Sequence, residues 1–210
     1  MIKNIVFDMG GVLISFDAQR YTARFVPDPA DYELIRRELF RSVEWIRMDR
    51  GSITDEQAVS SVCRRLPERL HRAVRDILDN WHRDIPPLDG VYDLVKELKD
   101  KGYGIYLLSN TCSRFHSFRE NIPALRFFDG EFISADCHLV KPEPGIYLRF
   151  LEQFGLRPEE CVFIDDVPLN IEAAIRCGFS GIVYHNDPIR LRRELRELGV
   201  DAAPAGPRRA

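Results

Sequence analysis

The chain has 210 residues, of which 30% are charged, and its formal net charge is −3. This length suits one large domain or a core domain with an insertion. Acidic and basic residues are interspersed, and a surface for nucleic acid or an anionic membrane would carry a basic bias. The exception is a short basic patch, which we expect to be the solvated face of a late helix: Arg190, Arg192, Arg193 and Arg196.

The five cysteines are odd in number, widely spaced and free of a Cys-x-x-Cys pair. This pattern argues against a disulfide framework and against a zinc site, and it fits a reducing compartment. We find no apolar run approaching 18 residues and no pattern of a signal peptide. The sequence therefore predicts a cytoplasmic protein without a membrane segment.

The first predicted element is a buried strand over residues 3–8, which ends in Asp8 and runs into Gly10-Gly11. From residue 17 to 84 the apolar spacing is helical, with no strand candidate. This block breaks at residues 49–52, and Thr54 then provides a capped helix start.

After Pro87 the pattern alternates between helix and strand. Strands are predicted over residues 105–108, 131–134, 161–164 and 181–184. Helices are predicted over residues 90–101 and 145–154, after Asp166 to about residue 177, and after the last strand to about residue 198. Such alternation predicts an α/β protein with a Rossmann-like parallel sheet of five core strands in the order 5-4-1-2-3. We expect an α/β core of residues 1–16 and 85–200, an inserted all-helical cap of residues 17–84, and a disordered tail of residues 201–210.

Polar residues close three of the predicted strands. They are Asp8, the pair Ser109-Asn110 and the pair Asp165-Asp166. The carboxyl ends of parallel strands share one edge of the sheet, where ligands bind in open α/β folds. Three gathered carboxylates repel one another, and a hard cation such as Mg²⁺, with its preference for oxygen ligands, removes that repulsion. As an alternative, Asp165-Asp166 is a helix N-cap pair.

Two further polar segments fit an anion. Ser109-Asn110 offers a hydroxyl, an amide and backbone N–H groups at a helix start, although both residues are also ordinary caps. Lys141, directly before Pro142, adds a point charge suited to a phosphate or an aspartate nucleophile. A lysine in a loop is more often solvated, so Lys141 is a candidate for the site only because the other motifs accompany it.

The order and spacing of Asp8, Ser109, Lys141 and Asp165-Asp166 resemble the four motifs of the haloacid dehalogenase-like hydrolase superfamily. The helical insertion resembles its small helical cap. Shorter segments are similar to bacterial phosphatases that hydrolyse α-glucose 1-phosphate: Phe7-Asp8-Met9-Gly10-Gly11, Arg50-Gly51-Ser52-Ile53-Thr54, Leu108-Ser109-Asn110-Thr111, Lys141-Pro142-Glu143 and Phe163-Ile164-Asp165-Asp166.

This resemblance implies a Mg²⁺-dependent phosphatase in which Asp8 attacks phosphorus and forms an aspartyl-phosphate. It implies that Asp8, the backbone carbonyl of Gly10 and Asp166 hold Mg²⁺, with Asp165 in support. Ser109, Asn110 and Lys141 would bind the phosphoryl oxygens. The partner is then a small-molecule phosphate ester, with no nucleic acid and no membrane, and we expect a monomer or weak homodimer.

The chain departs from the pattern at Gly10, where most phosphatases of this superfamily have a general acid and base. Two alternatives stay open: a non-catalytic phospholigand-binding protein, and a haloacid dehalogenase, which needs neither this acid nor a metal. His116 is the histidine nearest to a motif, but a surface or core position is more usual, and we expect Cys112 to be a buried inert thiol. Cap residues beside the break are candidates for substrate specificity: Glu44, Trp45, Arg47 and Arg50.

Overall fold

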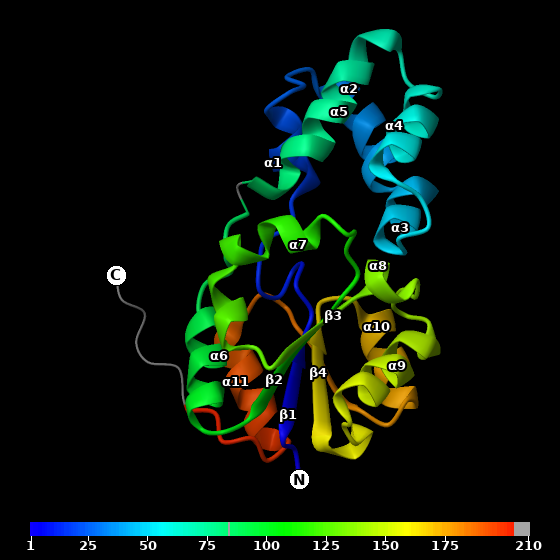
Figure 1. Ribbon diagram of the computed structural model, residues 1–210. Coiled ribbons are helices and arrows are strands. Elements are labelled where there is room, and N and C mark those ends of the chain that lie inside the picture. Colours follow the sequence, from blue (N-terminus) through cyan, green and yellow to red (C-terminus); the bar gives the residue numbers. More distant parts are fainter. Residues whose placement is uncertain (84, 204–210) are drawn as a thin grey trace, which may run out of the picture.

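The computed structural model describes residues 1–83 and 85–203 (Figure 1). A parallel sheet of five strands has the order β3-β2-β1-β4-β5, which confirms the predicted architecture, since it is the same order read from the other edge. The strands are β1 (Asn4–Phe7), β2 (Gly104–Ser109), β3 (Gly130–Ile133), β4 (Cys161–Asp165) and β5 (Ser180–Val183). Each lies within one residue of its predicted position. On central β1, Ile5 pairs with Ile105 of β2 and with Val162 of β4.

Helices cover both faces of the sheet. They are α6 (Val91–Asp100), α7 (Phe115–Phe118), α8 (Ser134–Cys137), α9 (Pro144–Phe154), α10 (Pro168–Arg176) and α11 (Pro188–Glu197). Successive residues of β1 point to opposite faces, so Ile5 and Phe7 join the core under α6 and α11, while Val6 joins the core under α9 and α10. Both faces are apolar because parallel strands with crossover helices are buried on both sides.

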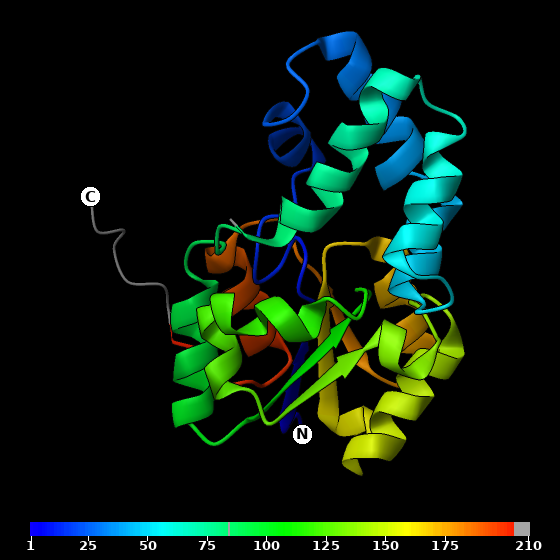
Figure 2. The same cartoon turned by 45° about the horizontal axis from the view of Figure 1, so that its top comes forward.

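The described residues between β1 and residue 83 form helices and no strand. These are α1 (Ala18–Ala23), α2 (Pro29–Ile35), α3 (Val43–Asp49), α4 (Asp55–Cys63) and α5 (His71–Asn80), with a π-helical turn at Arg36–Phe40 and 3₁₀ turns at Glu68–Leu70 and Trp81–Arg83. Further 3₁₀ turns lie at Arg119–Asn121, Pro123–Phe127 and Pro158–Glu160. At the predicted start of α4, Thr54 forms a capping box with Gln57. We call this insertion the cap; Figure 2 shows it above the carboxyl edge of the sheet.

The cap has its own core, which includes Ile35, Leu39, Val62, Val74 and Ile77. Its predicted division from the α/β core stays a prediction, and its last residue, number 84, lies outside the described residues. No helix of residues 1–83 or 85–203 has the length and apolar character needed to cross a membrane.

Two surface predictions were wrong in part, at α11 and just beyond it. Arg190, Arg193 and Arg196 are exposed as expected, but Arg192 is not. Arg192 is buried, not solvated, because its guanidinium pairs with Glu97 of α6 and donates to the carbonyl of Ala203 at 3.1 Å. The first residues of the predicted tail are also ordered: Ala202 is buried, and the backbone N–H of Asp201 donates to the Tyr103 hydroxyl at 2.8 Å. The rest of that tail, residues 204–210, lies outside the described residues.

Candidate active site

The carboxyl edge of the sheet gathers the polar residues that close its strands. Asp8 follows β1, Ser109 ends β2, and Asp165 ends β4. Asp8, Asp165 and Asp166 each place one carboxylate oxygen within 4.8 Å of the others. Because neighbouring parallel strands end together here, residues far apart in the chain meet at one point.

Lys141 lies at the centre of this group and is buried. Its ammonium Nζ is 2.8 Å from Asp8 Oδ1 and 2.6 Å from Asp165 Oδ2, and it donates to the carbonyl of Leu108 at 3.0 Å. These three acceptors match the three N–H donors of a lysine. Burial lowers the pKa of Lys141, but the charges of Asp8 and Asp165 outweigh burial and raise it. The lysine is therefore a fixed cation that holds two carboxylates together.

The two oxygens of Asp8 differ in their surroundings. Oδ1 accepts from the backbone N–H of Met9 at 2.7 Å and faces Lys141. Oδ2 has no hydrogen bond among the described residues. Burial raises the pKa of Asp8 to about 7; Lys141 opposes this shift, and the charge of Asp165 adds to it. Asp8 thus has one anchored oxygen and one open oxygen, as a nucleophile requires.

Asp165 is the most constrained of the three acids. It is fully buried, and besides Lys141 it accepts from the backbone N–H of Val167 at 2.8 Å and from the amide of Asn170 at 3.0 Å. Val167 is itself the N-cap residue of α10, and no side chain caps that helix, so the alternative of Asp165-Asp166 as an N-cap pair was wrong. Asp165 positions Lys141 and the start of α10.

Asp166 is the exposed member of the cluster and lies against Gly11. A Cβ atom on Gly11 would come within 2.3 Å of Asp166 Oδ2, and Gly11 also has a positive φ of +73°. Only glycine meets both conditions without strain. Gly10 has room for a Cβ atom, which would lie 3.8 Å from Phe16 Cβ.

The charges and donors of the cluster fit a divalent cation. The cluster contains three carboxylates and one ammonium, which pairs with two of them, so the local formal charge is −2. The carbonyl oxygen of Gly10 accepts no hydrogen bond among the described residues, although the neighbouring Gly11 N–H donates to Ile14. Carboxylate and carbonyl oxygens are the ligands of a hard cation such as Mg²⁺. Asp8, Gly10 and Asp166 could hold such an ion, whereas the carboxylate of Asp165 is paired with Lys141.

Ser109 and Asn110 have different surroundings. The hydroxyl of Ser109 has no hydrogen-bond partner among the described residues, although the residue is buried. The Asn110 amide donates to the carbonyl of Lys141 at 3.0 Å and accepts from its backbone N–H at 2.8 Å. Ser109 is thus open to a phosphoryl oxygen, whereas the Asn110 side chain fixes the main chain of the lysine.

The two remaining residues near the motifs have no direct place in the cluster. His116 is exposed on α7, and its Nε2 lies 3.0 Å from Asp136. Cys112 is half-buried, and burial, with the charge of Asp49 as a second cause, raises its pKa to about 12. A thiol that stays protonated is a poor nucleophile, so an inert Cys112 stays the prediction, although the residue is less buried than expected.

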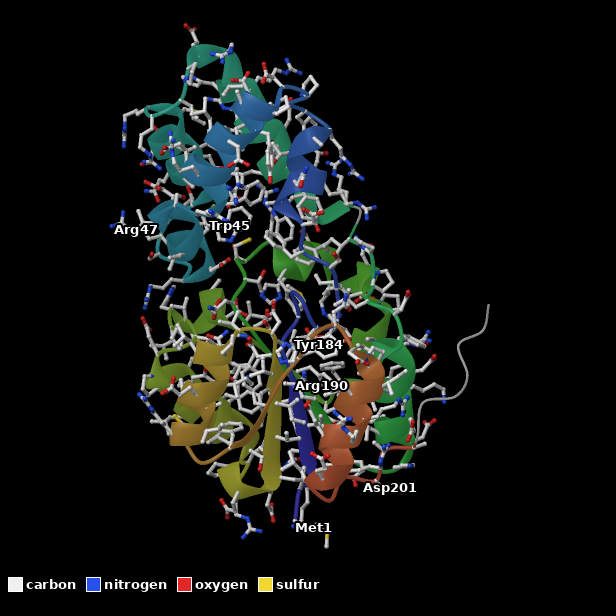
Figure 3. The ribbon with its side chains drawn as sticks, turned by 180° about the vertical axis from the view of Figure 1, so that it is seen from behind. Met1, Trp45, Arg47, Tyr184, Arg190 and Asp201 are labelled. Atoms are coloured by element: carbon white, nitrogen blue, oxygen red, sulfur yellow. The ribbon has the colours of Figure 1, made fainter. Side chains whose placement is uncertain are left out.

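Three of the predicted specificity residues lie on α3, and their side chains point in different directions: Glu44, Trp45 and Arg47. Glu44 is buried, and its carboxylate is bound by Arg65 at 2.8 Å within the cap. Trp45 turns toward the inside, where its ring is 4.9 Å from Phe40 and 5.7 Å from Phe16, and Arg47 extends outward (Figure 3). Glu44 therefore has a structural contact that the sequence did not indicate.

Phe16 was missed by the sequence analysis. Its side chain is 40% exposed, lies beside Gly10 and packs on Trp45. Phe16 joins the loop after β1 to an aromatic cluster at the base of the cap. This cluster includes Trp81, whose ring centroid lies 5.7 Å from that of Phe16. An exposed aromatic ring so near the nucleophile offers an apolar surface to a bound ligand.

The cap meets the core at the break that follows α3. Arg50 pairs with Glu143 in the loop before α9, and its carbonyl lies 3.1 Å from His138 Nδ1. A Cβ atom on Gly51 would come within 2.4 Å of the Ala135 carbonyl, so the backbones are nearly in contact. Arg50, a predicted specificity residue, thus joins cap and core.

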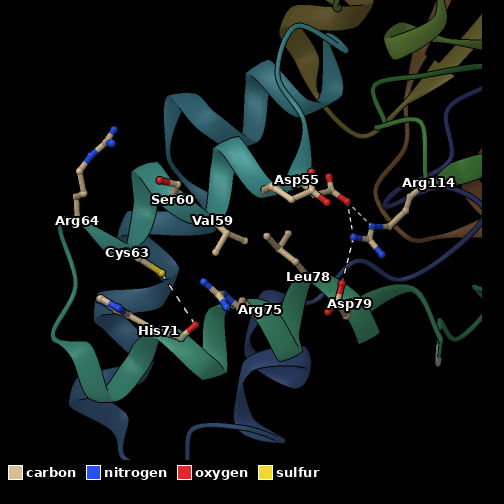
Figure 4. A pocket seen from close by; sticks show the side chains of 11 residues that line it. Asp55, Val59, Ser60, Cys63, Arg64, His71, Arg75, Leu78, Asp79 and Arg114 are labelled. Carbon is tan, nitrogen blue, oxygen red and sulfur yellow. Dashed lines mark hydrogen bonds and ion pairs between the residues drawn. The ribbon is translucent and has the colours of Figure 1, made fainter.

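A pocket of 540 Å³ lies in the cap (Figure 4), and Asp8, Asp165 and Asp166 are not among its lining residues. It lies between α4 and α5, and Arg114 from the core reaches its edge, where it pairs with Asp55 and Asp79. Its other lining side chains include Val59, Cys63, His71, Arg75 and Leu78. The reacting groups described above are not among them, so we assign the chemistry to the sheet edge.

The fold and the site together define a class of protein: an α/β protein in which a buried lysine holds an aspartate at the carboxyl edge of the sheet, under a helical cap. Residues 2–178 match the family described as haloacid dehalogenase-like hydrolase. The chain belongs to that family, and it is a hydrolase.

Two curated relatives illustrate the range of this similarity. The chain is 28% identical to the flavin mononucleotide hydrolase 1 of Arabidopsis thaliana over 76% of its own length, and it spans only 63% of that protein. It is 27% identical to the D-ribitol-5-phosphate phosphatase of Bacteroides thetaiotaomicron, over 86% of this chain and 90% of that one. These relatives support the hydrolase family, but they do not show the predicted resemblance to glucose 1-phosphate phosphatases.

A solved structure shares the fold. It is a family enzyme from Bacteroides thetaiotaomicron in complex with magnesium and inorganic phosphate. The TM-score is 0.71 at 24% sequence identity, and the match covers 91% of this chain and 99% of that one.

Proposed function

We propose that the protein is a Mg²⁺-dependent phosphatase that hydrolyses a small phosphorylated metabolite through an aspartyl-phosphate. The observation that carries this proposal is Lys141, which bridges Asp8 and Asp165 beside the open carboxylate of Asp166. A similar chain acts on D-ribitol 5-phosphate, and a similar fold binds magnesium and phosphate. When bound, Mg²⁺ would supply positive charge against the phosphoryl oxygens.

The residues of the chain have separate roles in this reaction. Oδ2 of Asp8 attacks phosphorus, the bond from phosphorus to the ester oxygen breaks, and the aspartyl-phosphate forms. The Ser109 hydroxyl donates to a phosphoryl oxygen. Lys141 keeps Oδ1 of Asp8 fixed, so the nucleophile approaches in one orientation. Water then attacks phosphorus, releases phosphate and restores Asp8.

We infer that the alcohol of the substrate is a sugar or polyol, and that glucose 1-phosphate is a member of this class. The exposed ring of Phe16, supported by Trp45, would lie against a sugar face. An anomeric oxygen is also a good leaving group, which suits a site with glycine at position 10. The cytoplasmic location and the monomer or weak homodimer remain predictions.

The test is phosphate release from a panel of phosphate esters with Mg²⁺ present. We expect turnover of sugar phosphates, loss of turnover in a chelator, and no turnover by Asp8→Asn, which should still fold. Phosphate binding without turnover would instead indicate a phospholigand-binding protein. Chelator-insensitive halide release from a 2-haloacid would indicate a dehalogenase.

A further inference from the structure

Asp49, the last residue of α3, has a carboxylate with no hydrogen bond and no ion pair among the described residues. It is only partly exposed. A half-buried carboxylate without a partner is uncommon, because its desolvation is not offset by a contact. The sequence analysis missed it, since residues 49–52 there indicated only a break between helices.

The backbone of Asp49 is fixed to the edge of the sheet that carries the nucleophile. Its carbonyl accepts from the hydroxyl of Ser134 at 2.6 Å, directly after β3. The same hydroxyl accepts from the backbone N–H of Thr111 at 2.9 Å, two residues beyond Ser109. Figures 1 and 2 place the end of α3 against α8. The ion pair between Arg50, which follows α3, and Glu143 joins the cap to the core at the same place.

The charges that act on Asp49 belong to the groups at the carboxyl edge of the sheet. Burial raises the pKa of Asp49 to about 7; the negative charge of Asp8 adds to this shift, and Lys141 opposes it. The carboxylate of Asp49 is in turn one cause of the raised pKa of Cys112, in the loop after Ser109. The cap therefore contributes a fourth acid near the carboxyl edge of the sheet, where Ser134 binds its backbone.

We propose that Asp49 is the general acid and base of the reaction and fills, from the cap, the role that Gly10 cannot fill. This inference rests on the proposed function. Its basis is the position of an unpaired, half-buried carboxylate on a residue whose backbone is fixed, through Ser134, to the loop that follows Ser109.

The proton balance closes over one cycle. As Asp8 attacks phosphorus, the ester oxygen leaves with the bonding electrons and takes the proton of Asp49, giving the free alcohol. In the second half, water attacks the aspartyl-phosphate while the Asp49 carboxylate accepts one proton from it. The bond from phosphorus to Asp8 breaks, phosphate leaves, and Asp49 is protonated again.

The experiment compares two leaving groups in wild type and Asp49→Asn, both with Mg²⁺. For glycerol phosphate, whose alkoxide must be protonated, we expect kcat/KM of the variant to fall by about 10²–10⁴-fold. For p-nitrophenyl phosphate, whose leaving group needs no proton, we expect a burst of one equivalent of nitrophenolate followed by slow turnover. The burst arises because the aspartyl-phosphate forms but loses its base for hydrolysis.

Two controls separate this role from a structural one. Asp76→Asn removes an exposed cap carboxylate, paired with Arg72, and should leave both substrates unaffected. Asp49→Ser repeats the comparison with a smaller side chain, and thermal melting verifies that each variant is folded. Activity gained by adding Gly10→Asp to Asp49→Asn supports the proposal, since position 10 has room for a side chain.

The outcomes distinguish this proposal from the proposed function. An Asp49→Asn or Asp49→Ser variant that matches wild type on both esters, or that loses both equally without a burst, overturns the role of Asp49 alone. If wild type hydrolyses neither ester nor any sugar phosphate, the proposed function fails and Asp49 has no reaction to serve.

Discussion

The ammonium of Lys141 lies 2.8 Å from Oδ1 of Asp8, and both groups are buried. Asp8, the proposed nucleophile, is therefore anchored by a residue from a distant loop, and its second oxygen accepts no hydrogen bond among the described residues. Lys141 holds Asp165 at 2.6 Å in the same way. This arrangement makes the lysine important for stability as well as for chemistry.

Replacing Lys141 by methionine should destabilise the protein in a chelator by about 3–5 kcal/mol, because two buried carboxylates lose their counter-ion. Urea unfolding measures this change. Lys96→Met is the matched control, since Lys96 pairs with Asp100 on the surface of α6 and such a pair contributes about 0–0.5 kcal/mol. Equal stability of Lys141→Met and wild type would contradict the bridging role.

Gly11→Ala should weaken Mg²⁺ binding about 10–100-fold, because the added methyl group displaces Asp166. Titration calorimetry measures the affinity. Gly155→Ala has a similar positive φ of +63° but no atom within 4 Å, so it should cost backbone strain of about 1 kcal/mol and leave the affinity unchanged. A similar loss in both variants would show that strain, not contact with Asp166, is responsible.

Asn110→Ala removes both hydrogen bonds to the main chain of Lys141. We expect kcat to fall about 10–100-fold with little change in KM, because the lysine and the nucleophile lose their alignment. Steady-state kinetics on one sugar phosphate provides the measurement. Asn80→Ala, which removes an amide bound to a cap carbonyl, should retain wild-type kcat. A rise in KM alone would instead indicate that Asn110 binds phosphate directly.

Phe16→Ala should raise KM for sugar phosphates about 10-fold, since it removes the apolar surface beside the nucleophile. Inhibition by inorganic phosphate should not change, because phosphate alone does not reach that surface. Leu148→Ala, an exposed apolar residue of α9, serves as the control. An equal loss for phosphate and sugar phosphate would place the effect of Phe16 at the phosphoryl site.

Glu97 should make stability dependent on acid pH. Burial raises its pKa, but hydrogen bonds from Ala203, Arg192 and Lys101 outweigh burial and lower it to about 2. Because the folded pKa lies below the unfolded value near 4.5, the contribution is present above about pH 4.5 and is lost as pH falls toward 2.

Glu97→Gln should therefore reduce the free energy of unfolding by about 1–2 kcal/mol at pH 7, and by progressively less below pH 4.5. Urea unfolding over this pH range measures the difference. Glu120→Gln, on an exposed pair, should differ little from wild type. A difference that is independent of pH would mean that Glu97 contributes through packing alone.

Much of the fold could be predicted from the sequence, because the spacing of apolar residues and the length of a strand are local properties of the chain. The strands at 105–108 and 161–164 were predicted within a residue or two, and their polar ends indicated the reacting edge. The basic patch shows the limit of this reasoning: a pattern on α11 cannot reveal that Glu97, on another helix, binds Arg192.

The sequence by itself determined the sheet, the helical insertion and the meeting of Asp8, Ser109 and Asp165, because parallel strands bring their carboxyl ends to one edge. Only the tertiary structure decided that Lys141 is buried between two acids, that Asn110 holds its backbone, and that Ser134 binds the carbonyl of Asp49 at the same edge. These relationships depend on how the cap and the loops pack, and such packing joins side chains whose separation along the chain carries no local signal.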